Sequence, residues 1–190
     1  MTEGSGPTIV GAPQQIDGHL VLVGLPGAGK STVGRAVARQ LGRPFLDFDV
    51  EIERRVGSSV ARYFAEHGEA AFRALEVELT RELTAAPPMV LAPGGGWVTN
   101  AGVVEMLRPP GRLVHLLVSP AEALRRIGRS RTVRPLLQDD DPLGRMERLW
   151  AARCALYNAA DSIVDVESVV GQRLTDYVAQ LAQLGTPEVG

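Results

Sequence analysis

A glycine-rich segment near the N-terminus constrains this chain more than any other feature. Residues 24–31 read GLPGAGKS and fit the pattern G-x-x-x-x-G-K-[ST]. The apolar run LVLV precedes the segment, and a helical pattern with Val33 and Val37 on one face follows it. Glycines let successive backbone N–H groups face one anion, and a helix N-terminus adds partial positive charge. The segment therefore predicts a phosphate-binding loop between a buried strand and a helix.

Lys30 is the only lysine among the 20 lysine and arginine residues of the chain. A position that keeps lysine where arginine is used everywhere else needs a compact ammonium group and not a planar fork. In such a loop Lys30 would reach the β- and γ-phosphates of a nucleotide, and the Ser31 hydroxyl would bind Mg²⁺. The alternative is a glycine-rich turn with an accidental Lys-Ser pair.

Composition places the chain among ordinary globular proteins. It has 190 residues, 45% of them hydrophobic and 22% charged, and a net charge of −2, which argues against a general nucleic-acid binder. The single cysteine, Cys154, excludes an internal disulfide and fits a reducing compartment. We see no signal peptide and no apolar run of about 18 residues, so we expect a cytoplasmic protein without a membrane span. We expect a flexible leader over residues 1–18, one domain over 19–185 and a tail over 186–190.

Apolar runs alternate with helical patterns from His19 onward. Further strands are predicted at 45–47, 89–92, 112–118 and 163–166. Helices are predicted at 50–85 with breaks at Gly57 and Gly68, then from the Ser119-Pro120 capping signal to 127, at 142–159 and at 169–184. This alternation predicts an α/β fold of three layers, α/β/α, around a five-stranded, mostly parallel sheet.

Two carboxylates, Asp47 and Asp49, close the second predicted strand. Residues two apart on a strand face the same side, so both would lie beside the phosphate site. One could hold Mg²⁺ through water, and the other could take a proton from an acceptor hydroxyl. The alternative for Asp49 is a capping role for the helix that begins near Val50.

A second group of polar residues follows a helical spacing. Glu69, Phe72, Arg73 and Glu76 share one helix face. They form either a solvated ladder of ion pairs or an arginine held by carboxylates for an anionic substrate, and the pattern alone does not choose. The triple glycine Gly94–Gly96 follows the third strand, where bare backbone lets a ligand approach closely.

A basic segment follows the helix after Ser119. Five arginines fall within ten residues that contain no acid, namely Arg125, Arg126, Arg129, Arg131 and Arg134. Residues 139–141 (DDD) then reverse the charge. The segment at 128–141 is either a solvated charged loop or a mobile lid that closes over ATP and brings an arginine to the transferred phosphate. We prefer the lid because the phosphate loop precedes it.

Together these pieces resemble the shikimate kinase family, in the nucleoside-monophosphate-kinase-like branch of the P-loop NTPases. The resemblance covers residues 19–184. It is carried by residues 24–32, 47–49, 68–76, 94–96, 132–137 and 153–157.

The resemblance implies ATP-dependent phosphorylation of the 3-hydroxyl of shikimate with Mg²⁺, with an acceptor-binding region over about 48–78. We expect a monomer, because the sequence has no dimer signal such as a heptad seam. It implies an ATP site made of Gly27, Ala28, Gly29, Lys30, Ser31, Thr32 and Arg134. It implies Ser31 and Asp47 as the magnesium residues, and a shikimate site made of Asp49, Arg73, Glu76, Gly95, Gly96 and Arg153. The residues implied to act in catalysis are Lys30, Asp49 and Arg134.

Two departures and two rival functions stay open. Trp97 stands where the family suggests a small residue, and Pro93 stands where it suggests a less rigid one, so the acceptor pocket could have a different wall. One rival is a kinase for another hydroxy acid such as gluconate, which does not need the combination of Asp49, Arg73 and Arg153. The other rival is a non-catalytic nucleotide-binding domain, for which catalytic groups should be missing.

Overall fold

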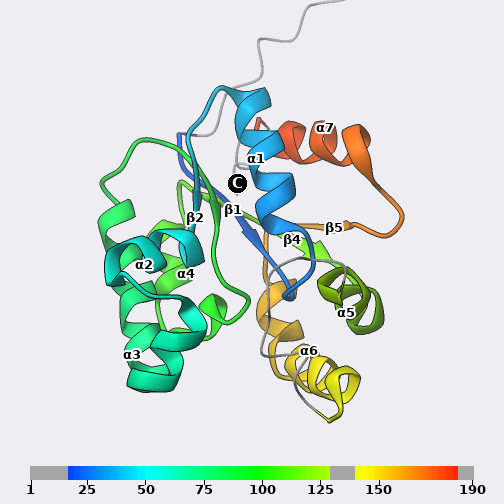
Figure 1. Ribbon diagram of the computed structural model, residues 1–190. Helices are drawn as coiled ribbons and strands as arrows, with labels where there is room; N and C mark the ends of the chain where they lie inside the picture. The colour runs from blue at the N-terminus through cyan, green and yellow to red at the C-terminus, as the bar shows by residue number, and fades with distance from the viewer. Residues whose placement is uncertain (1–16, 129–139, 184–190) are drawn as a thin grey trace, which may run out of the picture.

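The computed structural model describes residues 17–128 and 140–183 of this chain. Its centre is a five-stranded parallel sheet in the order β2-β3-β1-β4-β5 (Figure 1). In chain order the strands are β1 (Leu20–Val23), β2 (Phe45–Asp47), β3 (Val90–Ala92), β4 (Arg112–Leu117) and β5 (Ser162–Asp165). All four residues of β1 are buried, as expected for the central strand of a sheet covered on both faces. The predicted α/β class and the five parallel strands are confirmed.

Helices cover both faces of this sheet. They are α1 (Lys30–Leu41), α2 (Phe48–Val56), α3 (Val60–Leu83), α4 (Val103–Leu107), α5 (Pro120–Gly128), α6 (Pro142–Asn158) and α7 (Gly171–Leu181). Helices α1 and α7 pack against each other (Figure 1). The connection through α1 runs from β1 toward the β2 edge of the sheet, whereas the connections through α3, α4 and α6 run toward the β5 edge. Because parallel crossovers are right-handed, α3, α4 and α6 lie on the opposite face from α1.

The strand order brings two glycine-rich loops together. Strand β1 has β3 and β4 as neighbours, and the parallel pairing aligns Leu20 with Val90. The loop after β1 and the loop after β3 therefore leave the same edge of the sheet side by side. Ligands of open α/β sheets bind at the carboxyl ends of the strands where the chain changes direction across the sheet.

Glycine breaks separate the helices of the acceptor region as the sequence predicts. Gly57 ends α2 with φ of 69°, and Gly68 has φ of 79° and ψ of 170° at a kink inside α3. Both conformations favour glycine because they lie in the left-handed half of backbone space. The kink starts a new helical segment that carries Glu69, Arg73 and Glu76 on one side.

Two short elements were not predicted. A 3₁₀ turn, η1 (Trp97–Thr99), and the five-residue helix α4 lie between β3 and β4. Each is too short to produce a helical hydrophobic period, which explains why the sequence pattern did not indicate them. They nevertheless position Trp97 and Asn100 beneath the triple glycine.

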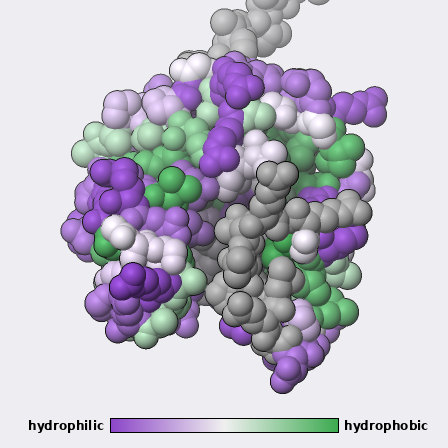
Figure 2. All heavy atoms as spheres, viewed as in Figure 1, coloured by the Kyte–Doolittle hydropathy of each residue, from purple (hydrophilic) through white to green (hydrophobic). Residues whose placement is uncertain are grey.

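Several sequence predictions fall outside the described residues. These are nearly all of the leader, the tail after residue 183 and most of the lid, including Arg129, Arg131 and Arg134. Among the residues that the structure describes, no helix is both long and apolar enough to cross a membrane. Figure 2 shows hydrophilic side chains gathered over α2 and α3, where exposed ion pairs such as Arg54–Glu51 and Arg62–Glu66 lie.

Candidate active site

A cleft of about 630 Å³ opens at the edge of the sheet where the two glycine loops meet. Its floor is the phosphate loop and the first turn of α1, and one wall is the loop after β3. Of the residues predicted for the site, the cleft is lined by Gly27, Ala28, Gly29, Lys30, Ser31, Thr32, Asp47, Asp49 and Gly95. Residues of α5, of the segment between β5 and α7, and of α7 also line the cleft, with Arg126 and Thr175 among them.

The phosphate loop has the backbone that anion binding requires. Gly24, Gly27 and Gly29 have φ of 141°, 87° and 93°, and Gly29 caps α1 in the left-handed conformation. A Cβ on Gly27 would lie 2.4 Å from the carbonyl oxygen of Ala123, so this position excludes other residues by contact as well as by conformation. The Lys30 ammonium donates to the carbonyl oxygens of Gly24 (2.9 Å) and Leu25 (3.1 Å), which holds it over the loop.

Ser31 and Asp47 meet at the floor of the cleft. The Ser31 hydroxyl donates to Oδ2 of Asp47 at 2.5 Å, although the two residues come from different elements. The other oxygen of Asp47 accepts the backbone N–H groups of Asp49 and Val50, so Asp47 is the N-cap of α2. Hydroxyl and carboxylate oxygens are the ligands that Mg²⁺ prefers, and the pair fits such an ion.

The second aspartate does not lie where the alternation predicted. Asp49 belongs to the first turn of α2 and not to a strand, because Asp47 already caps the helix there. The capping role that the sequence left open for Asp49 therefore falls to Asp47. Asp49 still lines the cleft, and its Oδ1 lies 3.1 Å from the place that a Cβ on Gly94 would occupy.

Glu76 approaches the same place from α3. Its Oε1 is also 3.1 Å from a Cβ built on Gly94, so two carboxylates from different helices converge beneath the glycine loop. The Glu76 side chain is fully buried, and Oε1 has no hydrogen-bond partner within the described residues. Burial raises the pKa of the Glu76 carboxyl, while hydrogen bonds from Arg73 and Asn100 and the charge of Arg153 act in the opposite direction.

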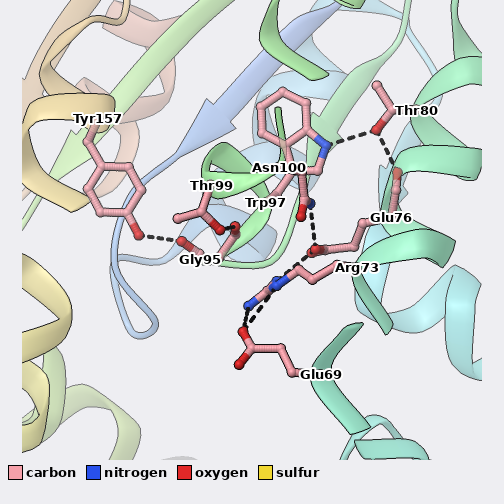
Figure 3. Close-up of polar contacts among 10 residues, drawn as sticks. Glu69, Arg73, Glu76, Thr80, Gly95, Trp97, Thr99, Asn100 and Tyr157 are labelled. Carbon is pink, nitrogen blue, oxygen red and sulfur yellow. Dashed lines mark hydrogen bonds and ion pairs between the residues drawn. The ribbon is translucent and has the colours of Figure 1, made fainter. Parts of the chain in front are cut away.

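Arg73 is fixed between two carboxylates, as Figure 3 shows. Its Nη1 donates to Oε2 of Glu76 and its Nη2 to Oε1 of Glu69, both at 2.7 Å. Burial alone would lower the pKa of the Arg73 guanidinium, but Glu76 and Glu69 raise it, so the group stays charged. A Cβ on Gly96 would lie 2.1 Å from Nη2 of Arg73, so the guanidinium packs directly on bare backbone. The structure thus favours a held arginine over a solvated ladder.

Arg153 and Tyr157 bring α6 to the same cluster. The charges of Arg153 and Arg73 both lower the pKa of the Tyr157 phenol, which burial raises. Arg153 also acts on the pKa of Glu76, so the two arginines face one group of buried residues. The Tyr157 hydroxyl donates to the carbonyl oxygen of Gly95 at 2.5 Å (Figure 3).

The site differs from its sequence prediction in two further ways. Arg73, Glu76, Gly96 and Arg153 are not among the cleft-lining residues; Glu76 lies next to Gly94, and Arg73 packs on Gly96. Trp97, which the sequence placed next to the acceptor pocket, is fully buried and does not line the cleft. Thr80, Asn100 and Tyr157 were not predicted as site residues, since their roles depend on contacts between distant segments.

Comparison with known proteins decides the family. A family model described as shikimate kinase matches residues 26–182. The chain belongs to the shikimate kinase family. It is therefore an enzyme of the kinase class. The matched range includes residues 26–31 of the phosphate loop and the acceptor cluster, made of Asp49, Arg73, Glu76 and Arg153.

Individual shikimate kinases match most of the chain. That of Paracidovorax citrulli is 51% identical over 145 residues, which cover 75% of this chain and 79% of the relative. That of Cupriavidus pinatubonensis is 42% identical over 169 residues, 88% of each chain. The structure of shikimate kinase from Acinetobacter baumannii in complex with shikimate aligns with a TM-score of 0.78 and 36% identity, covering 89% of this chain and 93% of that chain.

Proposed function

We propose that this chain transfers the γ-phosphoryl group of ATP to the 3-hydroxyl of shikimate, giving 3-phosphoshikimate and ADP. Membership of the shikimate kinase family supports the reaction. The observation that carries it in the structure is the meeting of Asp49 and Glu76 beneath Gly94, at the end of the cleft that holds the phosphate loop. The proposed phosphate site and the proposed acceptor site would thus be adjacent at Gly94.

The phosphate loop would hold the nucleotide. Backbone N–H groups of residues 27–32 and the Lys30 ammonium supply positive charge for the β- and γ-phosphates, and Arg134 is proposed to approach from the lid. Ser31 and Asp47 would hold Mg²⁺, which neutralises phosphate charge when it is bound. Catalysis is then mostly positioning and charge stabilisation, because phosphoryl transfer needs little covalent chemistry from the protein.

Asp49 would activate the acceptor. The oxygen of the 3-hydroxyl forms a bond to the γ-phosphorus, the bond from that phosphorus to the β–γ bridging oxygen breaks, and the hydroxyl proton passes to the Asp49 carboxylate. Arg73 and Arg153 would bind the shikimate carboxylate, since two guanidinium groups suit a planar anion. Glu76 orients Arg73, and bare backbone at Gly95 and Gly96 lets the ring lie close.

The rival functions receive less support. A gluconokinase from Sinorhizobium meliloti aligns with only 19% identity and a TM-score of 0.54, a likeness of fold alone. A non-catalytic nucleotide-binding domain would not need a buried arginine–carboxylate cluster beside its phosphate loop. Asp49, Arg73 and Arg153 are all present, and the contacts of each lead to Glu76: Asp49 approaches it at Gly94, Arg73 pairs with it, and the charge of Arg153 acts on it.

An ADP-release assay tests the proposal. Shikimate, gluconate, quinate and nucleoside monophosphates are offered in turn with Mg-ATP, and we expect turnover with shikimate alone. We expect Arg153→Ala to raise the KM for shikimate at least tenfold with little change in the KM for ATP. Arg148→Ala is the matched control, because Arg148 is an exposed arginine on the same helix that pairs with Asp141. Turnover with another acceptor only, or an increase confined to the KM for ATP, would overturn the assignment.

A further inference from the structure

Trp97 makes a buried polar contact that the proposed chemistry does not use. Its indole Nε1 donates to Oγ1 of Thr80 at 2.8 Å (Figure 3). The Thr80 hydroxyl in turn donates to the backbone carbonyl of Glu76 at 2.7 Å. Trp97 and Thr80 are both fully buried, so each donor and acceptor in this chain of bonds would lose its partner without replacement by water.

The same tryptophan also holds the glycine loop. Its backbone N–H donates to the carbonyl oxygen of Gly94 at 3.0 Å, and its ring packs edge-on against Phe48 at 6.3 Å between centroids. One residue therefore connects the loop after β3 to the helix that carries Arg73 and Glu76. These are the two halves of the acceptor cluster, and Trp97 is not among the residues that line the cleft.

The side chain of Asn100 completes the arrangement. Its Nδ2 donates to Oε2 of Glu76 at 2.9 Å, beside the bond from Nη1 of Arg73. Both donors bind the same carboxylate oxygen, which leaves Oε1 directed toward Gly94. Asn100 thus fixes the rotation of the Glu76 carboxylate. Thr80 holds the backbone of Glu76 through its carbonyl oxygen.

We propose that Thr80 is a positioning residue for acceptor binding, which joins the Trp97 indole to the backbone of Glu76 and so holds Arg73 and Glu76 in register with the glycine loop. The proposal rests on the proposed function and goes beyond it, because Thr80 and Trp97 are fully buried and neither lines the cleft. It also explains the size of Trp97, because the large residue after the triple glycine reaches from the loop to α3.

Steady-state kinetics with shikimate and Mg-ATP test this role. We expect Thr80→Val to raise the KM for shikimate about two- to tenfold, the range for one lost hydrogen bond, with the KM for ATP unchanged. Thr80→Ser keeps the hydroxyl and should restore the wild-type KM. Thr84→Val is the matched control, since Thr84 is an exposed threonine at the end of α3 whose hydroxyl donates to the carbonyl of Arg81.

Trp97→Phe gives an independent measurement that leaves no buried donor unpaired. It should raise the KM for shikimate to a similar extent. The double variant Thr80→Val/Trp97→Phe should be no worse than the more affected single variant, because both remove the same bond. Urea unfolding of each variant verifies that the folded protein is being assayed.

The outcomes separate the two proposals. If the wild-type enzyme binds Mg-ATP but does not phosphorylate shikimate, the proposed function is wrong and the positioning role falls with it. If the wild-type enzyme phosphorylates shikimate, three results would each overturn the positioning role alone. They are an unchanged KM for shikimate in Thr80→Val and Trp97→Phe, equal increases in both KM values, and failure of Thr80→Ser to restore the wild-type value.

Discussion

The Tyr157 hydroxyl donates a hydrogen bond of 2.5 Å to the carbonyl oxygen of Gly95. Tyr157 lies one helical turn after Arg153 on α6, so this bond fixes the helix that carries Arg153 against the glycine loop. Thr80 and Trp97 do the same for the helix that carries Arg73. The loop after β3 is therefore the common support of both arginines.

We predict that Tyr157→Phe weakens acceptor binding and the fold together. Loss of the hydroxyl leaves the Gly95 carbonyl without this partner, and we expect the free energy of unfolding to fall by about 1 kcal/mol. The KM for shikimate should rise several-fold because α6 is less firmly held. Urea unfolding and steady-state kinetics measure the two effects. Tyr177→Phe, on an exposed tyrosine of α7, is the control and should change neither value.

Lys30→Ala should abolish turnover and leave the fold intact. The Lys30 ammonium donates to the carbonyl oxygens of Gly24 and Leu25, which holds it over the loop that would bind the phosphates. Removal of one preorganised charge of this kind costs at least about 100-fold in rate. Lys30→Arg should fail as well, because a planar fork does not fit a site built for a compact ammonium. ADP release and circular dichroism are the measurements, and near-normal activity in the alanine variant would contradict the scheme.

The fold and the phosphate loop could be predicted because their signals are local. The loop at 24–31 is contiguous, and the strands and long helices have hydrophobic periods that read directly from the sequence. The break at Gly57 and the kink at Gly68 were equally visible, since each rests on the conformational freedom of one residue.

The support of the acceptor site could not be predicted in the same way. Asn100 lies 24 residues from Glu76 in the sequence and Tyr157 lies 62 residues from Gly95, and no periodic pattern links residues so far apart. Trp97 was noticed in the sequence only as a departure from a family pattern. Its burial beneath the loop depends on η1, an element of three residues. Asp49 was assigned to a strand because alternation cannot show that Asp47 already caps a helix.

Gly96→Ala should impair acceptor binding selectively. A methyl group there would lie 2.1 Å from Nη2 of Arg73, so the guanidinium must move away from the glycine loop. We expect the KM for shikimate to rise at least tenfold while the KM for ATP stays near its wild-type value. Gly128→Ala is the control, since a Cβ at that position meets no atom of residues 17–128 or 140–183 within 4 Å. Equal KM values for shikimate in the wild type and Gly96→Ala would show that Arg73 need not lie on bare backbone.

The buried imidazole of His115 should make stability depend on pH. His115 lies on β4 opposite Val23, stacked on Tyr157 at 5.3 Å between ring centroids, and both of its ring nitrogens are buried. Burial lowers the pKa of His115 to about 4, since it outweighs the opposing interaction with the Asn158 side chain, and the positive charge of Lys30 acts in the same direction as burial. The imidazole is therefore neutral in the folded enzyme at neutral pH.

The sign of the effect follows from proton uptake. Between pH 6.5 and pH 4 the unfolded chain binds a proton at His115 that the folded protein does not, so the free energy of unfolding falls as pH falls through this window. At pH 5 the free energy of unfolding is lower by about 2 kcal/mol than at neutral pH, and this loss levels off below pH 4. His115→Phe keeps a ring in the stack and should lose this part of the pH dependence. Urea unfolding at pH 7.5 and pH 5 measures this change in the free energy of unfolding. His67→Gln, at an exposed position of α3, is the control and should keep the wild-type pH dependence. If His115→Phe and the wild type lose equal stability between these pH values, the buried imidazole is not the titrating group.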